Sequence, residues 1–467
     1  MQVKTLSNTI VGALENSKMR SLNQILMRLL PFVLLTCQLC LSETLTVDPN
    51  GSGDFTNIQD AINFAYDFDT IVVYPGLYEE HINYNSAWIK LTSIDPNDIQ
   101  IVENTVIDGS GEGNVVMFSN AEGQHASLCG FTIQNGEVGI RCIGADTAPV
   151  ISQCHIKSNS VGVLCNLSKP SVLFSTITGN TQNGIASSRG SVSDCFVADN
   201  GQSGMIDCIG DIINSVFQNN GESGIRTHRG TIRNSLIHGN LSHGIHYPYD
   251  YHNVWHCTIT NCTIVGNKGS GICLNINDKS AITITNTILA ANFYFGIINT
   301  FGVPVTIDYS NSWGNKAGDL SSASWNPLRL GSHMISEKPF FAKSGYWDQD
   351  NVWHEGEYHL RSKTGRWDTR KQDWASDPVD SPCLDRGDPS VSTGDEPLPN
   401  GGIINMGAYG GTSKASMSGG PAPICTQFPV MDFNKDCKVD FLDYSIFSEH
   451  WLECNLYPNN ACGTHSD

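Results

Sequence analysis

A short phrase recurs through the middle of this chain: an asparagine, a few small or polar residues, then a glycine followed by an aliphatic residue. The glycines of the phrase stand at positions 139, 162, 184, 204, 224, 244, 271 and 296, so successive copies are 20 to 27 residues apart. A repeat near twenty residues is typical of a solenoid, in which each coil packs on its neighbours. The repeat therefore predicts the architecture of residues 135–315 but says little about activity.

Each coil also contains a strand upstream of its asparagine, in which apolar and polar residues alternate. The position three residues before the asparagine is apolar in seven copies: Ile156, Ile177, Val197, Phe217, Ile237, Ile264 and Leu289. Alternation with a period of two turns these side chains inward, where they stack as one column. Cys154, Cys195 and Cys262 fall in a second inward column, so we interpret them as small buried residues. The asparagines are predicted to be structural, because stacked amides bond to one another along such an array.

The beginning of the chain reads as an export signal. Residues 27–42 contain one arginine, an apolar run and small residues before a plausible cleavage point, which indicates a signal peptide over residues 1–42 with a true start at Met1, Met19 or Met27. The apolar run is too short to span a bilayer, and no later stretch is a candidate span. We therefore expect a secreted, extracellular or cell-surface protein with no membrane span.

Charge narrows the range of partners. The net charge of −19 argues against nucleic acid, which requires a basic surface. It also disfavours an anionic polymer, unless a local basic patch or calcium bridges the charges.

The N-terminal segment supplies a cap for the array. Ile58, Ala61, Ile62 and Ala65 recur at helical spacing and predict a short amphipathic helix, which can cover the first open coil. Together with the segment DTIVVYPGLYEE, the repeats resemble the right-handed parallel β-helix, or pectin-lyase-like, superfamily. The resemblance implies an all-β fold with an N-terminal helical cap: a β-helix over residues 43–335, last coils and a C-terminal cap over 336–412, and a linker over 413–424.

The same resemblance leaves the activity open, because one fold carries many functions. The superfamily contains polysaccharide lyases, hydrolases, epimerases and non-catalytic surface proteins. It implies a polysaccharide-associated protein, and a carbohydrate-active enzyme similar to a polysaccharide lyase is the leading hypothesis. If the protein is an enzyme, a glycoside hydrolase of this fold is the other possibility. The alternative is a non-catalytic surface, adhesive or carbohydrate-binding solenoid.

Residues 425–467 form a distinct acidic tail. The segment 432–443 places oxygen ligands at the spacing that a calcium ion requires: Asp432, Asn434, Asp436, the carbonyl of Lys438, Asp440 and Asp443. This stretch resembles the calcium loop of type I dockerins, which implies an EF-hand-like tail with calcium as cofactor and a cohesin-like protein as partner. Two departures count against that partner: Cys437 replaces the usual glycine, and only one loop is present where a dockerin has two.

Six of the 14 histidines lie between Arg226 and His256, in a chain that is otherwise acidic. The residue after each glycine–aliphatic pair should face outward, so Arg226 and His246 are predicted neighbours on adjacent coils, about 4.8 Å apart. His228, two residues beyond Arg226, is expected on the same face.

A lyase mechanism can be written on these residues. Arg226 would neutralise a uronate carboxylate, and His228 or His246 would act as the general base. Tyr247 or Tyr249 would donate to the leaving oxygen, and Tyr247, Tyr249 and Asp250 are the candidate substrate-binding residues. An inverting hydrolase would need paired carboxylates, for which Asp250 and an inward-facing Asp207 are the nearby candidates. The alternative interpretation is that these residues belong to a solvated outer face without catalytic function.

Overall fold

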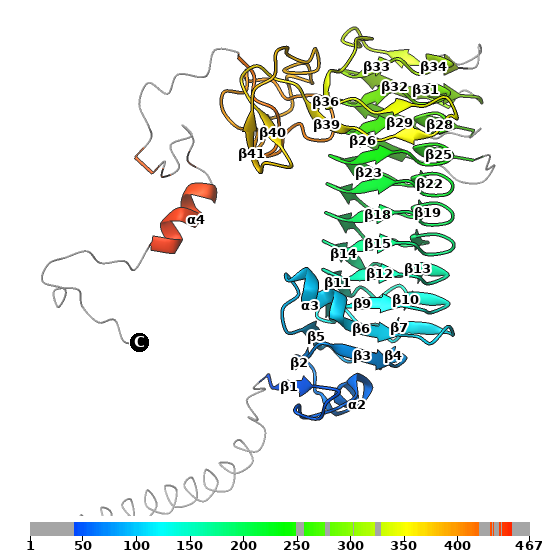
Figure 1. Ribbon diagram of the computed structural model, residues 1–467, viewed down its shortest axis with the longest axis vertical. Coiled ribbons are helices and arrows are strands. Elements are labelled where there is room, and N and C mark those ends of the chain that lie inside the picture. Colours follow the sequence, from blue (N-terminus) through cyan, green and yellow to red (C-terminus); the bar gives the residue numbers. More distant parts are fainter. Residues whose placement is uncertain are drawn as a thin grey trace, which may run out of the picture.

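The computed structural model describes residues 42–248, 256–275, 281–301, 303–322, 328–419, 430–431, 433, 439 and 441–450. Within these residues three long parallel sheets wind around a common axis (Figure 1). Each coil contributes a strand to each sheet in turn, so neighbouring strands in a sheet come from successive coils. The predicted all-β solenoid is therefore confirmed.

Sheet 1 is 13-stranded and contains β1 (Thr44–Val47), β2 (Thr70–Val73), β5 (Lys90–Ser93), β8 (Ser127–Cys129), β11 (Val150–Ser152), β14 (Ser171–Leu173), β17 (Val192–Ser193), β20 (Ile212–Ile213), β23 (Gly230–Arg233), β26 (His256–Thr260), β29 (Ala281–Thr285), β32 (Val305–Asp308) and β35 (Arg329–Leu330). Sheet 2 is 11-stranded and contains β4 (Ile82–Asn83), β7 (Asn114–Phe118), β10 (Val138–Ile143), β13 (Val161–Asn166), β16 (Ile185–Ala186), β19 (Met205–Ile206), β22 (Ile225–Arg226), β25 (Ile245–Tyr247), β28 (Ile272–Leu274), β31 (Phe295–Asn299) and β34 (Gly318–Ser322).

Sheet 3 is also 11-stranded and contains β3 (Gly76–Glu79), β6 (Thr105–Asp108), β9 (Thr132–Gln134), β12 (His155–Lys157), β15 (Thr176–Thr178), β18 (Phe196–Ala198), β21 (Val216–Gln218), β24 (Leu236–His238), β27 (Thr263–Val265), β30 (Ile288–Ala290) and β33 (Asn311–Trp313). Three antiparallel pairs follow the solenoid: β36 (Phe341–Lys343) with β39 (Glu357–Leu360), β37 (Tyr346–Trp347) with β38 (Trp353–His354), and β40 (Arg366–Asp368) with β41 (Asp373–Ala375). The helices among the described residues are α2 (Ile58–Phe64), α3 (Ile99–Asn104) and α4 (Phe441–His450). In this part of the chain no helix is long and apolar enough to cross a bilayer.

The apolar column predicted from the repeat forms the core of sheet 3. All seven of its residues are fully buried, and Phe217 pairs in register with Ile237 on the next coil. The cysteines of the second column, such as Cys262, are buried as predicted. Continuous apolar columns are the expected source of stability in an array whose coils contact only their neighbours.

The repeated asparagines form a ladder of side-chain hydrogen bonds inside the turns. Each amide nitrogen donates to the amide oxygen of the asparagine on the next coil, from Asn159 through Asn180, Asn200, Asn220, Asn240, Asn267 and Asn292 to Asn315. The glycine of each phrase has to be small here: a Cβ on Gly224 would lie 2.9 Å from the amide nitrogen of Asn240. The predicted structural role of the repeated asparagines is confirmed.

Helix α2 lies at the N-terminal end of the solenoid (Figure 1) and buries Ile58, Ala61 and Ile62. Its first N–H groups have no partner within the helix, and the Glu80 carboxylate accepts those of Ile58 and Gln59 at 2.9 Å each. The predicted helical cap is confirmed.

The segment that follows the solenoid folds back onto the outer face of sheet 3. A second apolar cluster joins Leu236, Val265 and Ile288 of that face to Phe341 and Tyr358 of the cap. Trp353 of β38 packs on the glycine turns, because a Cβ on Gly266 would lie only 2.0 Å from its ring. Residues 341–419 therefore form a cap that covers the later coils from the side.

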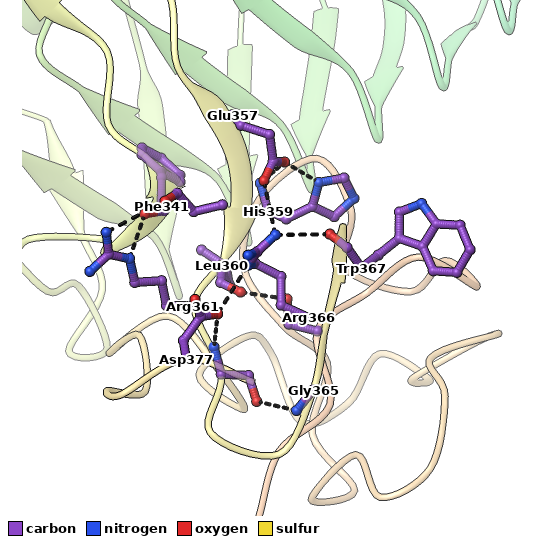
Figure 2. Close-up of polar contacts among 12 residues, drawn as sticks. Phe341, Glu357, His359, Leu360, Arg361, Gly365, Arg366, Trp367 and Asp377 are labelled. Atoms are coloured by element: carbon purple, nitrogen blue, oxygen red, sulfur yellow. Dashed lines mark hydrogen bonds and ion pairs between the residues drawn. The ribbon is translucent and has the colours of Figure 1, made fainter. Parts of the chain in front are cut away.

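A partly buried ion network holds the cap together (Figure 2). Arg366 lies between two carboxylates, with its Nε 3.0 Å from Asp377 Oδ2 and its Nη1 3.2 Å from Glu357 Oε2. Glu357 also bonds to His359 Nδ1, and the His359 ring stacks on Tyr409 with centroids 3.6 Å apart. The network links β39, β40 and the loops that follow them.

Candidate functional site

Arg226 and His246 lie on adjacent strands, β22 and β25, and pair directly in register. Both side chains are half-buried on the outer face of sheet 2. Arg226 Nη1 forms an ion pair with Glu222 Oε2 at 3.3 Å. Burial, together with the charges of His243 and Arg226, lowers the pKa of His246 to about 4, so its imidazole is neutral at pH 7. The predicted adjacency is confirmed.

His228 does not share this face, and the prediction that it does is wrong. Its side chain is 1% exposed, inside the solenoid. The strict alternation ends at Thr227, which adopts a left-handed backbone with φ of +54° and turns the next residue inward. Cys208 and Ser188 occupy the buried positions 20 and 40 residues earlier. His228 therefore cannot contact a polymer on the surface.

Replacing His228 by cysteine, the residue at the corresponding position of the preceding coil, should flatten the acid dependence of stability. Burial lowers the pKa of His228 to about 4, against about 6.5 in an unfolded chain. The unfolded state then binds more protons, so this residue destabilises the fold progressively as pH falls from about 6.5 to 4, by on the order of 3 kcal/mol in total. Urea unfolding of both proteins at pH 7 and pH 4.5 measures the difference, and equal losses on acidification would contradict the assignment.

Tyr247 is also misplaced by the prediction. It is 0% exposed and belongs to the solenoid core, because β25 alternates inward at Ile245, outward at His246 and inward again at Tyr247. Asp207, expected inward, is exposed and has a left-handed backbone with φ of +54°. Tyr249 and Asp250 lie outside the described residues.

Of the six predicted calcium ligands, Asp432, Asn434, Asp436, Lys438 and Asp440 lie outside the residues that the structure describes. Asp443 is described: it is buried, and its Oδ1 accepts the backbone N–H of Phe433 at 2.7 Å.

A separate polar site, which sequence reasoning missed, lies where the last coils meet the cap. A cavity of about 490 Å³ is lined from the solenoid side by Tyr309 and His333, and from the cap side by Asp385 and Arg386. It combines an imidazole, a guanidinium, a phenol and a carboxyl group within one hollow. Concave sites with a few polar groups of this kind are where ligands most often bind.

The Asp308 carboxylate orients His333. Its Oδ2 lies 3.2 Å from His333 Nδ1, and its Oδ1 accepts the backbone N–H of His333 at 3.0 Å. Burial tends to raise the pKa of Asp308, but hydrogen bonds from His333 and the Tyr309 N–H lower it overall, so the group is ionised. An ionised carboxylate only accepts, so with a neutral ring the shared proton sits on Nδ1 and leaves the electron pair of Nε2 available.

Tyr309 fixes the plane of this imidazole. The two rings stack with centroids 4.2 Å apart and an angle of 5°. Ser332 Oγ lies 3.4 Å from His333 Nδ1, the nitrogen that Asp308 already holds, so the trio does not have the arrangement of a nucleophilic serine. The Asp308 contact and the Tyr309 stack therefore hold the ring in one orientation beside the cavity.

A similar pair elsewhere on the chain serves as an internal comparison. His354 Nε2 lies 2.8 Å from Asp348 Oδ2, and its ring stacks on Tyr346 with centroids 4.7 Å apart. This pair belongs to the β37–β38 hairpin, whereas the Asp308–His333 pair borders the cavity. An Asp–His–Tyr stack alone therefore does not indicate a functional site. The Asp308–His333 pair is a candidate because it borders a cavity that Arg386 also lines.

Comparison with known proteins agrees with the fold. A family model described as "Right handed beta helix region" matches residues 225–326. No curated protein matches the chain significantly in sequence.

Among solved structures, pectate lyase Pel9A is similar with a TM-score of 0.50 and 15% identity, covering 79% of this chain and 96% of that one. The A-module of Azotobacter vinelandii mannuronan C-5 epimerase AlgE4 has a TM-score of 0.39 and 14% identity, covering 60% and 95%. The catalytic domain of a GH87 alpha-1,3-glucanase has a TM-score of 0.34 and 8% identity, covering 57% and 64%. The family model and the likeness to the pectate lyase show the fold alone: the chain is a right-handed parallel β-helix.

Proposed function

We propose that this protein acts on a polysaccharide, and that it cleaves a uronate polymer by elimination in the cavity beside His333. One observation carries the proposal: a carboxylate-held imidazole borders a cavity of about 490 Å³ that an arginine also lines. Sugar carboxylates are recognised by arginine, and aromatic rings such as Tyr309 suit the apolar faces of sugars.

The chemistry follows from the roles of these groups. Arg386 would neutralise the carboxylate of the bound uronate, which lowers the free energy of the carbanion that forms next to it. His333 Nε2 would take the proton from C5, the C4–O bond would break, and the leaving oxygen would take a proton from water. The product carries a C4=C5 double bond. A pectate lyase has the same fold, so the fold accommodates a site for this reaction.

Growth of ultraviolet absorbance from the unsaturated product tests the proposal, with a panel of uronate and neutral polysaccharides as substrates. His333→Gln is expected to reduce the rate roughly 100-fold or more, because a general base contributes about 10²–10⁴. His354→Gln is the matched control. His354 also contacts a carboxylate and stacks on a tyrosine, but it belongs to the β37–β38 hairpin and does not line the cavity. Equal rates for wild type and His333→Gln would sink the assignment.

The Arg226–His246 pair is the second candidate, favoured by its direct register on β22 and β25. The same assay separates the two sites, because Arg226→Ala or His246→Ala should then abolish the absorbance change while His333→Gln leaves it intact. Binding of a polysaccharide without any rise in absorbance or reducing sugar would instead support the non-catalytic carbohydrate-binding solenoid.

Export and calcium binding complete the proposal. An extracellular location fits a polysaccharide partner; the proposed signal, residues 1–42, lies almost wholly outside the described chain. For the tail we propose one calcium ion, supported by the buried Asp443 and its bond to the Phe433 N–H. Calorimetric calcium uptake by the wild type, lost in Asp443→Ala, is the expected result. A cohesin-like protein is proposed as a partner only on the resemblance of this loop to that of dockerins.

A further inference from the structure

The outer face of sheet 2 carries a second cluster of chemically active side chains. His243, His246 and Cys273 bring a ligand atom each to within 4.8 Å of one another. His246 and Cys273 are register partners on β25 and β28, so the sheet itself holds them side by side. His243 lies just before β25, and its ring centroid is 4.8 Å from that of His246.

We propose that His243, His246 and Cys273 form a binding site for a thiophilic divalent metal ion of the zinc class. Two imidazoles and a thiolate are the ligands that such ions prefer, and three protein ligands leave one position for water or substrate. Calcium and magnesium do not fit, because the cluster offers no oxygen ligand.

The burial of Cys273 and the missing hydrogen bond of His246 support a bound metal ion at this position. His246 Nε2 is buried and has no hydrogen-bond partner in the described structure, which is unusual for a buried ring nitrogen. The Cys273 side chain is 4% exposed, although its position faces outward in the alternation of β28.

Three features oppose metal binding and determine how it should depend on pH. Arg226 pairs in register with His246, but Glu222 balances its charge at 3.3 Å. His243 Nδ1 accepts the Ser270 N–H at 2.9 Å, and coordination requires the ring to release this bond or to rotate. A cysteine binds such a metal as a thiolate, so the metal must displace the Cys273 proton. Binding is therefore expected to tighten as pH rises and to release a proton.

Cobalt titration of the reduced, chelator-stripped full-length protein tests the site. Co²⁺ bound to a thiolate gives a near-ultraviolet charge-transfer band, and Zn²⁺ should abolish it by displacement. Cys273→Ser is expected to lose one equivalent of this band and to bind Zn²⁺ at least about tenfold more weakly. His246→Gln should weaken Zn²⁺ binding to a similar extent.

Cys262→Ser is the matched control and should bind metal as the wild type does. Cys262 faces the core, and serines occupy its column on other coils at Ser215 and Ser235, so the fold accepts the change. The thermal unfolding of each metal-free variant is compared with that of the wild type, and His246→Gln decides the question if Cys273→Ser does not fold. Absence of the band in the wild type, or the same cobalt stoichiometry in Cys273→Ser, would overturn the proposal. Because the assay measures metal uptake, its outcome is independent of the proposed lyase activity.

Discussion

Replacing Asn220 by alanine is expected to lower the free energy of unfolding by about 4 kcal/mol. Asn220 is fully buried, and its Nδ2 donates to Val197 O at 3.2 Å and to Asn240 Oδ1 at 2.9 Å. Its Oδ1 accepts the backbone N–H of Asn200 at 3.3 Å and the Asn200 side chain at 3.0 Å. Alanine leaves several buried groups without partners, and each costs about 1–3 kcal/mol.

Urea unfolding of the purified variant measures this loss. Gln218→Ala is the control, because Gln218 lies two residues earlier and is half-buried on the outer face of sheet 3. It should change stability by less than about 0.5 kcal/mol. A loss for Asn220→Ala as small as that of the control would mean that the ladder contributes little and that the apolar columns alone stabilise the coils.

Replacing Arg366 by methionine is expected to destabilise the cap by about 3 kcal/mol. The Arg366 side chain is 11% exposed and lies between Asp377 and Glu357 (Figure 2). Removing one partner of a buried ion pair leaves uncompensated charge, which costs about 3–5 kcal/mol. The lower end applies because Glu357 is 26% exposed and water screens its charge.

Limited proteolysis and urea unfolding detect the loosened cap. Arg370→Met is the matched control, since the Arg370 side chain is 90% exposed and its nearest carboxylate, that of Asp368, is 3.9 Å away. Cleavage within residues 341–419 should speed up for Arg366→Met alone. Equal proteolysis of the two variants would show that the apolar cluster holds the cap without help from the ion network.

The solenoid was predictable from sequence because its repeat reports the same geometry many times. The inward columns, the asparagine ladder and the pairing of Arg226 with His246 all follow from a period near twenty and an alternation of two. The same alternation places Tyr247 in the core, so that error was avoidable. His228 was not predictable in this way, because the left-handed backbone at Thr227 has no clear sequence signal.

The cavity beside His333 could not be found from the repeat. Asp308 belongs to one of the last coils and His333 lies 25 residues later, beyond the last copy of the asparagine–glycine phrase. Arg386 comes from the cap, whose fold back onto the solenoid depends on contacts between segments far apart in sequence. Local patterns do not report such contacts.

The central claim is that the cavity beside His333 binds a uronate polymer, and calorimetry with oligomers of each uronate in the substrate panel tests it most directly. Three proteins are titrated. The first is His333→Gln, which is expected to bind without cleavage. The other two combine His333→Gln with Arg386→Met or, as the control, with Arg370→Met. We predict saturable binding that Arg386→Met weakens at least about tenfold, or about 1.4 kcal/mol, and that Arg370→Met leaves unchanged. Absence of binding, or equal affinity in all three proteins, would contradict the account.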